Sequence, residues 1–324
     1  MNFTMDSIYL DAGAETTRLA IALKETVAFK LKKRGAVVGV SGGIDSSVVL
    51  ALCAKTFGPE KVFAIMMPER DSSPESKELA TDLCEKFKVP YILEDITDAV
   101  HGFGCYERRD EAVKRVFPEY NPKTYKMKIV LHADKEAKGK LNLFYLTIIT
   151  PDGEVKSQRL PLAEYLQIVA ASNFKQRSRT NMLYYHAEAK NFAVIGTGNK
   201  NEHEQGFFVK YGDGGADVKP IAHLFKTQVF QLAEFLGVPE DIRKRTPTTD
   251  TYSAEQTQEE FFYKMPFEVM DRIWDGWEKG VSSDVIAKIL GIQKAQVDSE
   301  INDIKQKIQT TEYLRQEPFS LGAL

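Results

Sequence analysis

Short apolar runs alternate with helical segments through the first 95 residues of the chain, and this alternation constrains the fold more than any other feature. The apolar runs cover residues 36–40, 62–67 and 91–93, and each has the length of one buried strand. The helical segments, which show apolar side chains four residues apart or capping residues, cover residues 16–33, 46–57 and 73–87. The pattern predicts a parallel sheet with helices on both faces, and such sheets bind ligands at the carboxyl ends of their strands.

The alternation breaks between residues 105 and 160. Residues 127–131 and 143–150 are β-like runs around a polar turn at residues 134–140, which predicts an inserted β-hairpin or meander. A surface elaboration is the simplest interpretation of this insertion. The alternatives are that the insertion forms a lid or a subunit contact.

The rest of the chain restores the α/β rhythm and ends in helices. The predicted elements are a helix at 162–189, a strand at 192–197, a helix at 226–236 and more helices beyond Pro266. We therefore expect a doubly wound α/β fold with about five parallel strands. Its expected segments are residues 1–104, the first half of the α/β domain; 105–160, the β-rich insertion; 161–265, the second half; and 266–324, the helical C-terminal region.

Composition argues against several classes of protein. A net charge of −3 over 324 residues predicts no general affinity for nucleic acid or anionic membranes. No apolar stretch approaches the ~18 residues of a membrane helix, and residues 1–17 lack the apolar run of a secretion signal. Cys53, Cys84 and Cys105 are odd in number and form no Cys-x-x-Cys, which favours a reducing cytoplasm over disulfides or zinc.

A glycine-rich loop, Ser-Gly-Gly-Ile-Asp-Ser at residues 41–46, joins the first predicted strand to the next helix. Gly42 and Gly43 allow backbone N–H groups to approach phosphate oxygens, and the helix N-terminus adds partial positive charge. Asp45 would repel a phosphate, so we expect it to hold a magnesium ion that the phosphates share. The loop matches neither the Walker A pattern nor the dinucleotide-binding Gly-x-Gly-x-x-Gly.

The string Ser-Gly-Gly-x-Asp-Ser resembles the pyrophosphate-binding loop of the N-type ATP pyrophosphatases. Within that superfamily, residues 196–202 and the glycine-rich residues 206–217 resemble the ammonia-dependent NAD synthetase family. Further stretches that match family elements are 173–179, 226–227, 247–250, and 311–318. The resemblance implies the adenine nucleotide α-hydrolase-like version of the doubly wound fold.

The resemblance also implies a reaction and its residues. ATP would adenylate the nicotinate carboxylate of deamido-NAD with release of pyrophosphate, and ammonia would displace AMP to give NAD. Asp45 and Glu202 would bind Mg²⁺, and these two acids with Lys210 and Asp217 would form the catalytic set. The residues implied to contact ATP are Gly39, Val40, Ser41, Gly42, Gly43, Ile44, Asp45, Ser46, Thr197, Lys226 and Thr248. The residues implied to contact deamido-NAD are Arg177, Lys210, Asp217, Tyr313 and Leu314.

The chemistry accounts for these residue types. A carboxylate is a poor electrophile, and adenylation converts one of its oxygens into a leaving group. Mg²⁺ with Lys226 and Lys210 can offset the charge that develops at the α-phosphate, and Arg177 suits an anionic dinucleotide. Asp213 and Asp217 are candidates for the base that takes a proton from ammonia.

Three departures from the family pattern, one of them the insertion at residues 105–160, leave the acid substrate open. Tyr313 and Leu314 stand where the family often has His-Lys, and Gln258 replaces a family acid. An amide ligase of the same kind acting on a different carboxylate is therefore the main alternative. A tRNA-modifying enzyme would favour a basic patch and a catalytic cysteine, which we do not find, and an ATP sensor would bind ATP without releasing AMP.

Residues 282–304 also resemble a helix-turn-helix, which would place one helix in a DNA groove. Its second helix carries Asp298, Glu300 and Asp303, so we expect two packed helices joined at Gly291 instead. The chain has no room for a glutaminase beside the ATP core, so the nitrogen donor is expected to be free ammonia or ammonia from a separate protein. The family resemblance further implies a homodimer.

Overall fold

The structure is a computed structural model that describes residues 3–133, 142–248 and 251–323 of the chain. Its central sheet holds four parallel strands in the order β3-β2-β1-β7. These strands are β1 (Ala36–Gly39), β2 (Val62–Met66), β3 (Tyr91–Leu93) and β7 (Ala193–Ile195). The order changes direction at β1, because β2 and β3 lie on one side of it and β7 on the other.

The sheet has one strand fewer than the five that we expected, counted over the described residues. A single parallel bridge joins Ile195 to Val218 at the β7 edge, where a fifth strand would add. Two residues later Pro220 offers no backbone N–H to a ladder, so the pairing does not extend. The doubly wound parallel sheet is confirmed, but the strand number was wrong.

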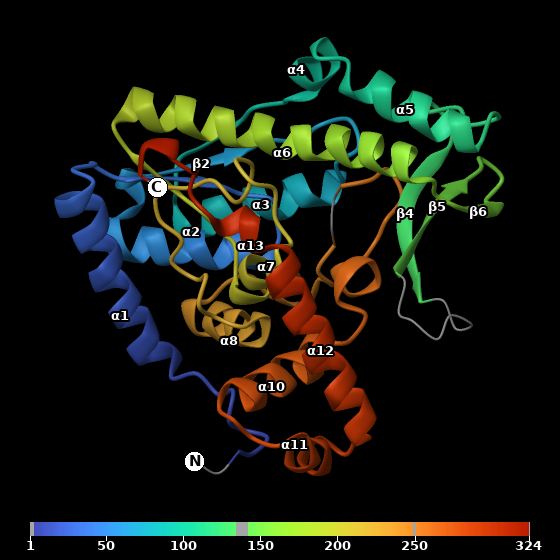
Figure 1. The fold of residues 1–324 in the computed structure, drawn as a ribbon. Helices are drawn as coiled ribbons and strands as arrows, with labels where there is room; N and C mark the ends of the chain where they lie inside the picture. Colours follow the sequence, from blue (N-terminus) through green and yellow to red (C-terminus); the bar gives the residue numbers. More distant parts are fainter. Residues whose placement is uncertain (1–2, 134–141, 249–250, 324) are drawn as a thin grey trace.

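Helices cover both faces of the sheet because the strand side chains alternate between two buried layers. Val38 points into one layer and Val37 into the other. The first layer contains α1 (Ala12–Lys24), α2 (Ile44–Phe57), α3 (Pro74–Phe87) and α8 (Lys226–Leu236). The second contains α4 (Thr97–Gly102), α5 (Cys105–Val116) and the long α6 (Leu162–Lys190), which runs along the top of Figure 1.

The insertion is an antiparallel meander that packs on α5 and α6. Its strands, in the order β4-β5-β6, are β4 (Lys126–Ala133), β5 (Asn142–Ile149) and β6 (Val155–Arg159). Met127 and Leu146 are fully buried and belong to one core with Val113 of α5 and Ile168 of α6. The predicted turn at residues 134–140 lies outside the described residues.

The boundary that we predicted for this insertion differs from the structure. Residues 105–116 were expected in the β-rich segment, yet they form helix α5. Cys105, Arg109, Ala112 and Val113 are buried, and their spacing of three to four residues places them on one helical face. The β structure therefore begins at Lys126.

The C-terminal region is helical, as predicted. After η3 (Glu259–Tyr263), which precedes it, the region contains α10 (Phe267–Glu278), α11 (Ser283–Leu290), α12 (Lys294–Thr310), α13 (Glu312–Arg315) and η4 (Leu321–Ala323). Gly291, at φ +66°, ends α11, and Ile286 of α11 packs with Val297 of α12 in one core. The two packed helices that we expected at residues 282–304 are confirmed.

The remaining helical segments are short. They are η1 (Glu25–Lys30), which continues α1, η2 (Pro59–Lys61), α7 (Lys200–Gln205) and α9 (Glu240–Lys244). Within the three described ranges, no helix combines the length and the apolar character that crossing a bilayer requires.

Candidate active site

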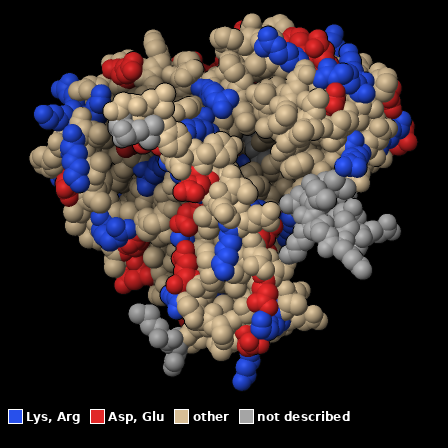
Figure 2. All heavy atoms as spheres, in the orientation of Figure 1, with Lys and Arg blue, Asp and Glu red and all other residues tan. Residues whose placement is uncertain are grey.

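A cavity of about 1060 Å³ opens at the carboxyl ends of β1 and β7. The chain leaves these neighbouring strands towards different elements, α2 and α7, so a crevice forms where the strand order reverses. The surface is hollowed near the centre of the face drawn in Figure 2. The volume reaches the upper end of the ~300–1,000 Å³ usual for ligand pockets, which allows room for more than one small ligand.

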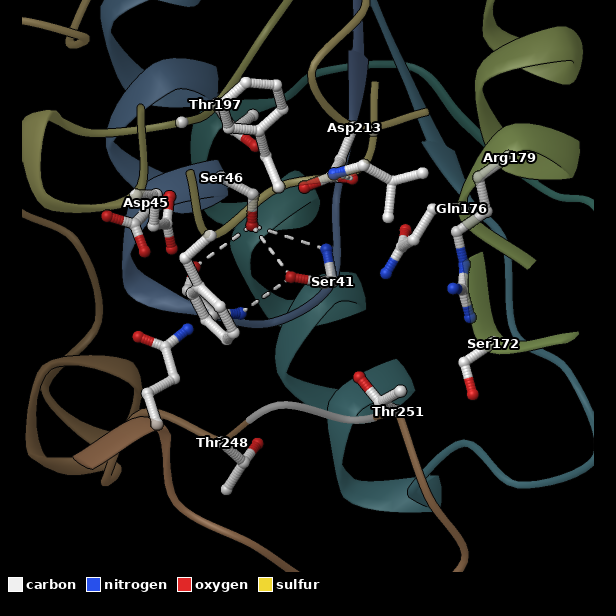
Figure 3. Close-up of a pocket in the computed structure, with 18 of the residues that line it drawn as sticks. Ser41, Asp45, Ser46, Ser172, Gln176, Arg179, Thr197, Asp213, Thr248 and Thr251 are labelled. Carbon is white, nitrogen blue, oxygen red and sulfur yellow. Dashed lines mark hydrogen bonds between the residues drawn. The ribbon is translucent and has the colours of Figure 1, made fainter. Parts of the chain in front are cut away.

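The loop between β1 and α2 forms one wall of the cavity. The Oγ atoms of Ser41 and Ser46 lie 3.3 Å apart, and Ser46 Oγ donates to the carbonyl of Gly43 at 3.0 Å (Figure 3). Gly42 has φ +74°, and a Cβ there would lie 2.5 Å from the carbonyl oxygen of Ser76. Only glycine fits this turn. No side chain caps the first turn of α2, so its N–H groups remain available to an anion.

Three charged side chains from different elements meet behind this loop. Asp45, in the first turn of α2, forms an ion pair with Nζ of Lys226, which is 1% exposed. Its other oxygen, Oδ1, accepts a hydrogen bond from Nδ2 of Asn199 at 2.9 Å. Burial and the neighbouring Asp45 carboxylate raise the pKa of Glu202 to about 8. Burial opposes the charge on Lys226, but Asp45 and Glu202 raise its pKa above the usual value.

Glu202 also caps its own helix. The side chain of Asn199 accepts from the backbone N–H of Glu202 at 3.0 Å, and Oε2 of Glu202 accepts from the N–H of Asn199 at 3.2 Å. This reciprocal pair is a capping box. It orients Glu202 at the start of α7 and leaves Oε1 outside the cap.

The donor set at Asp45 and Glu202 fits a magnesium ion. Two carboxylates that share one site repel each other, and a cation between them stabilises both. Within the described part of the chain, no cluster of three His, Cys, Asp or Glu side chains could hold a metal alone. Mg²⁺ commonly takes one or two carboxylates and completes its shell with water and phosphate oxygens.

Nearly all residues predicted to contact ATP line this cavity. Gly42 is the exception, because its turn faces Ser76 of α3. Figure 3 shows Thr197 beside the loop and Thr248 on the opposite wall. The predicted ATP residues that line the cavity are Gly39, Val40, Ser41, Gly43, Ile44, Asp45, Ser46, Thr197, Lys226 and Thr248.

Most residues predicted for the acid substrate line the same cavity. Arg177, Lys210, Tyr313 and Leu314 are among its wall residues. Nζ of Lys210 donates to the carbonyl oxygens of Tyr313 at 3.0 Å and Gln316 at 2.8 Å. Nε of Arg177 donates to the carbonyl of Lys210 at 3.3 Å. Lys210 therefore fastens the C-terminal segment against the cavity.

The structure places Asp217 differently from our expectation. It is not among the residues that line the cavity. Its Oδ2 accepts from the backbone N–H of Val194 at 2.8 Å, and its Oδ1 accepts from the hydroxyl of Tyr184 at 3.2 Å. The carboxylate thus braces β7, and this position does not support direct contact with substrate. Asp213 does line the cavity, and its Oδ1 accepts from the N–H of Val209 at 2.9 Å.

Sequence reasoning missed several wall residues. Arg179 and Gln176 of α6 lie across the cavity from Asp45 in Figure 3, and Nε of Arg179 donates to the carbonyl of Met67 at 3.0 Å. Arg179 lies in the motif at 173–179, so that motif could have revealed it. Leu131 and Phe144 of the meander also line the cavity. The insertion is therefore more than a surface elaboration.

Comparison with known proteins identifies the family. The protein-family model described as NAD synthase matches residues 15–136 and 140–318 of this chain. The chain belongs to the NAD synthase family. Two relatives, both named NH(3)-dependent NAD(+) synthetase, come from Mesorhizobium japonicum and Rhizobium meliloti. The first is 48% identical and the alignment covers 95% of this chain and 96% of the relative; the second is 46% identical, with 98% and 94% covered. The chain is therefore an enzyme, a ligase of this family.

Solved structures of NAD synthase relatives share the fold. An NH3-dependent NAD synthetase from Campylobacter jejuni superposes with a TM-score of 0.62 at 22% identity, covering 96% of this chain and all of that one. An NMN synthetase from Francisella tularensis gives a TM-score of 0.61 at 22% identity, with 96% and 98% covered. At this identity the likeness confirms the doubly wound fold alone.

Proposed function

We propose that this chain is an ammonia-dependent NAD synthetase, which adenylates the nicotinate carboxylate of deamido-NAD with ATP and amidates it. The observation that carries the proposal is the meeting of Asp45, Glu202 and Lys226 behind the Ser41–Ser46 loop. Such a combination suits a nucleoside triphosphate: the backbone N–H groups can bind its phosphates, the carboxylates can hold a metal ion, and the lysine supplies a positive charge. The named function of relatives at 46–48% identity supports the same substrate set.

The loop and Lys226 would act on ATP. The hydroxyls of Ser41 and Ser46 and the first N–H groups of α2 would hold the departing pyrophosphate. Mg²⁺ held by Asp45 and Glu202 would neutralise the phosphate oxygens. Nζ of Lys226, which pairs with Asp45, would also reach a phosphate oxygen and stabilise the charge that develops at the α-phosphate.

The acid would enter from the side of α6. Arg177 and Arg179 line that wall and suit the phosphates of an anionic nucleotide. A carboxylate oxygen of the acid attacks the α-phosphate and pyrophosphate leaves; ammonia then attacks the acyl carbon and AMP leaves with that oxygen. Asp213 would accept the proton that ammonia loses. Asp217 would act only by bracing β7.

One observation favours a different acid as the substrate. Tyr313 and Leu314 line the cavity and offer no cation to the second nucleotide of a dinucleotide. An acid with a single nucleotide would need no such contact, and the fold is shared with a protein named NMN synthetase. Nicotinate mononucleotide is therefore the second candidate.

Product analysis separates the two candidates. Purified protein would receive ATP, Mg²⁺ and ammonium with each acid in turn, and AMP, NAD and NMN would be measured by mass spectrometry. Equal amounts of AMP and NAD, formed only with deamido-NAD, support the proposal. If AMP and NMN form faster than AMP and NAD, the mononucleotide is the substrate. If neither acid leads to AMP formation, both candidates are overturned.

The proposal includes a homodimer. Leu162 and Leu166 lie one turn apart on α6 and are 71% and 55% exposed, and Phe103, whose ring packs 4.8 Å from that of Phe174 further along α6, is 61% exposed. Exposed apolar side chains grouped on one helix are typical of a subunit contact. Sedimentation should give twice the mass of one chain, and a fully active monomer would contradict the homodimer.

A further inference from the structure

One buried carboxylate of the C-terminal region contacts both elements that carry the charged groups of the site. Asp271 of α10 has no exposed surface. Its Oδ1 accepts from Nδ2 of Asn201 at 2.5 Å, and its Oδ2 accepts from the backbone N–H of Thr227 at 2.9 Å. Asn201 directly precedes Glu202 in α7, and Thr227 directly follows Lys226 in α8. Asp271 therefore forms hydrogen bonds to the residue before Glu202 and to the residue after Lys226.

A third hydrogen bond closes this arrangement into a ring. The backbone N–H of Lys226 donates to Oδ1 of Asn201 at 2.9 Å, and Asn201 is fully buried. The side-chain amide of Asn201 thus uses its oxygen towards α8 and its nitrogen towards α10. Two side chains thus join three helices, and each of the three bonds involves Lys226 itself or a residue directly next to Glu202 or Lys226.

Helix α7 depends on such side-chain contacts for its orientation. It has only six residues, Lys200–Gln205, and a helix of this length is not stable by itself. At its start Asn199 contacts Asp45 at 2.9 Å, and one residue after the start Asn201 contacts Asp271. The position of Glu202 relative to Asp45 is therefore fixed from two sides.

The charge of Asp271 also acts on Lys226. A carboxylate at the N-terminus of α8 is favourable because of the helix dipole. Asp271 is one of the groups that raise the pKa of Lys226, after Asp45 and Glu202. Burial raises the pKa of Asp271 itself to about 6, and both of its oxygens accept hydrogen bonds, as in a carboxylate. Lys226 consequently lies between an anion in front, Asp45, and an anion behind, Asp271.

We propose that Asp271 is a positioning residue of the ATP and metal site, because it holds Glu202 and Lys226 at their separation through Asn201 and Thr227. This inference rests on the proposed function, since it gives the ring a role in binding Mg·ATP. It assigns to the C-terminal helical region a part in nucleotide binding that does not require contact with the nucleotide. The acid side of the cavity, lined by Arg177 and Arg179, contains none of these bonds.

The first test is the isosteric variant Asp271→Asn. Its amide has one acceptor instead of two, so it cannot accept from both Asn201 and Thr227. The matched control is Asp275→Asn, four residues further along α10, where the carboxylate pairs with Lys279 at 2.7 Å and lies outside the cavity lining. Binding of Mg·ATP and of deamido-NAD would each be measured by calorimetry with the full chain.

The expected result is a split between the two ligands. Asp271→Asn should weaken Mg·ATP binding at least ~10-fold, which is about 1.4 kcal/mol, and change the Kd of deamido-NAD less than ~2-fold. Asp275→Asn should leave both unchanged. Equal weakening of both ligands, or unchanged Mg·ATP binding in Asp271→Asn, would overturn the inference. A wild type that binds Mg·ATP but makes no amide would instead contradict the proposed function.

An exchange variant tests the ring even if Asp271→Asn folds poorly. Asp271→Asn combined with Asn201→Asp preserves all three bonds: the new amide donates to the new carboxylate and accepts from Thr227, and the N–H of Lys226 still finds an acceptor. The double variant should bind Mg·ATP more tightly than Asp271→Asn and melt at a higher temperature. Binding no tighter than in the single variant, with folding restored, would show that the ring does not position the site.

Discussion

Lys226 and Asp45, separated by 181 residues in the sequence, form an ion pair at the back of the cavity. The pair joins the first turn of α2 to the first turn of α8, and Glu202 of α7 lies close enough for its pKa to respond to both groups. A bound phosphate group could contact Lys226, and a divalent cation bound with it could contact Asp45. The ion pair therefore places one cation and one carboxylate of the proposed ATP site in direct contact.

Asp45→Asn should remove activity without unfolding the protein. The amide keeps the shape and the contact with Asn199 but loses the charge that Mg²⁺ and Lys226 require. AMP formation should fall at least ~100-fold, with an unchanged circular dichroism spectrum. Asp82→Asn, on the exposed side of α3, is the control and should keep wild-type turnover. Near-normal AMP formation in Asp45→Asn would contradict the metal role.

Gly42→Ala tests the turn of the phosphate loop against a matched glycine. Gly42 and Gly237 share φ +74°, but a Cβ at Gly237 has no neighbour within 4 Å, whereas at Gly42 it lies 2.5 Å from the carbonyl of Ser76. Gly237→Ala should cost ~1 kcal/mol of unfolding free energy from backbone strain. Gly42→Ala should cost a further ~1–3 kcal/mol from the clash. Urea unfolding of both variants measures the difference, and equal losses would refute the close approach.

Lys210→Met tests whether Lys210 holds the C-terminal segment. The substitution keeps most of the side-chain length and removes both hydrogen bonds, to Tyr313 and Gln316. Hydrogen exchange over residues 311–316 should accelerate by ~10-fold or more, because ~1–3 kcal/mol of local stabilisation is lost. Lys288→Met, an exposed lysine of α11, should leave exchange in that segment unchanged. Unaltered exchange in Lys210→Met would show that other contacts hold the segment.

His203 should make the folded state sensitive to mild acid. Burial, helped by Lys219 and Arg315, lowers the pKa of His203 to about 4. The unfolded chain takes up a proton near pH 6.5 and the folded chain does not, so stability falls as the pH drops from about 6.5 towards 4. In His203→Gln the free energy of unfolding at pH 5 should fall by about 1 kcal/mol less than in the wild type, a figure reduced for solvent screening of the partly exposed ring. Urea unfolding at pH 7 and pH 5 measures it.

The control for this pH effect is His101→Gln, at an exposed position of α4. It should show the same fall in stability between pH 7 and pH 5 as the wild type. If His203→Gln also shows the wild-type fall, the protonation of His203 is not coupled to unfolding.

The phosphate loop and the doubly wound sheet could be predicted because their signals are local. Ser41 to Ser46 carry glycines, an acid and hydroxyls between an apolar run and a helix, and each feature constrains the backbone within a few residues. The ion pair of Asp45 with Lys226 was not predicted as a contact, although both residues were. It depends on the side-by-side packing of α2 and α8, which no local pattern encodes.

The misplaced features depend on tertiary packing. Helix α5 was assigned to the β-rich insertion because its apolar residues are few, and its buried face includes the charged Arg109 and Asp110. Asp217 belongs to a motif whose other members line the cavity, yet its carboxylate turns to Val194 and Tyr184. Whether Leu131 and Phe144 face the cavity is decided by how the meander packs on α6.

Transfer of labelled oxygen tests directly whether the enzyme adenylates a carboxylate. Deamido-NAD with ¹⁸O in its nicotinate carboxylate would be converted with ATP, Mg²⁺ and ammonium, and the products analysed by mass spectrometry. We expect one ¹⁸O in the phosphate of AMP and none in pyrophosphate. ADP as the nucleotide product, or ¹⁸O in any phosphate other than that of AMP, would contradict this expectation.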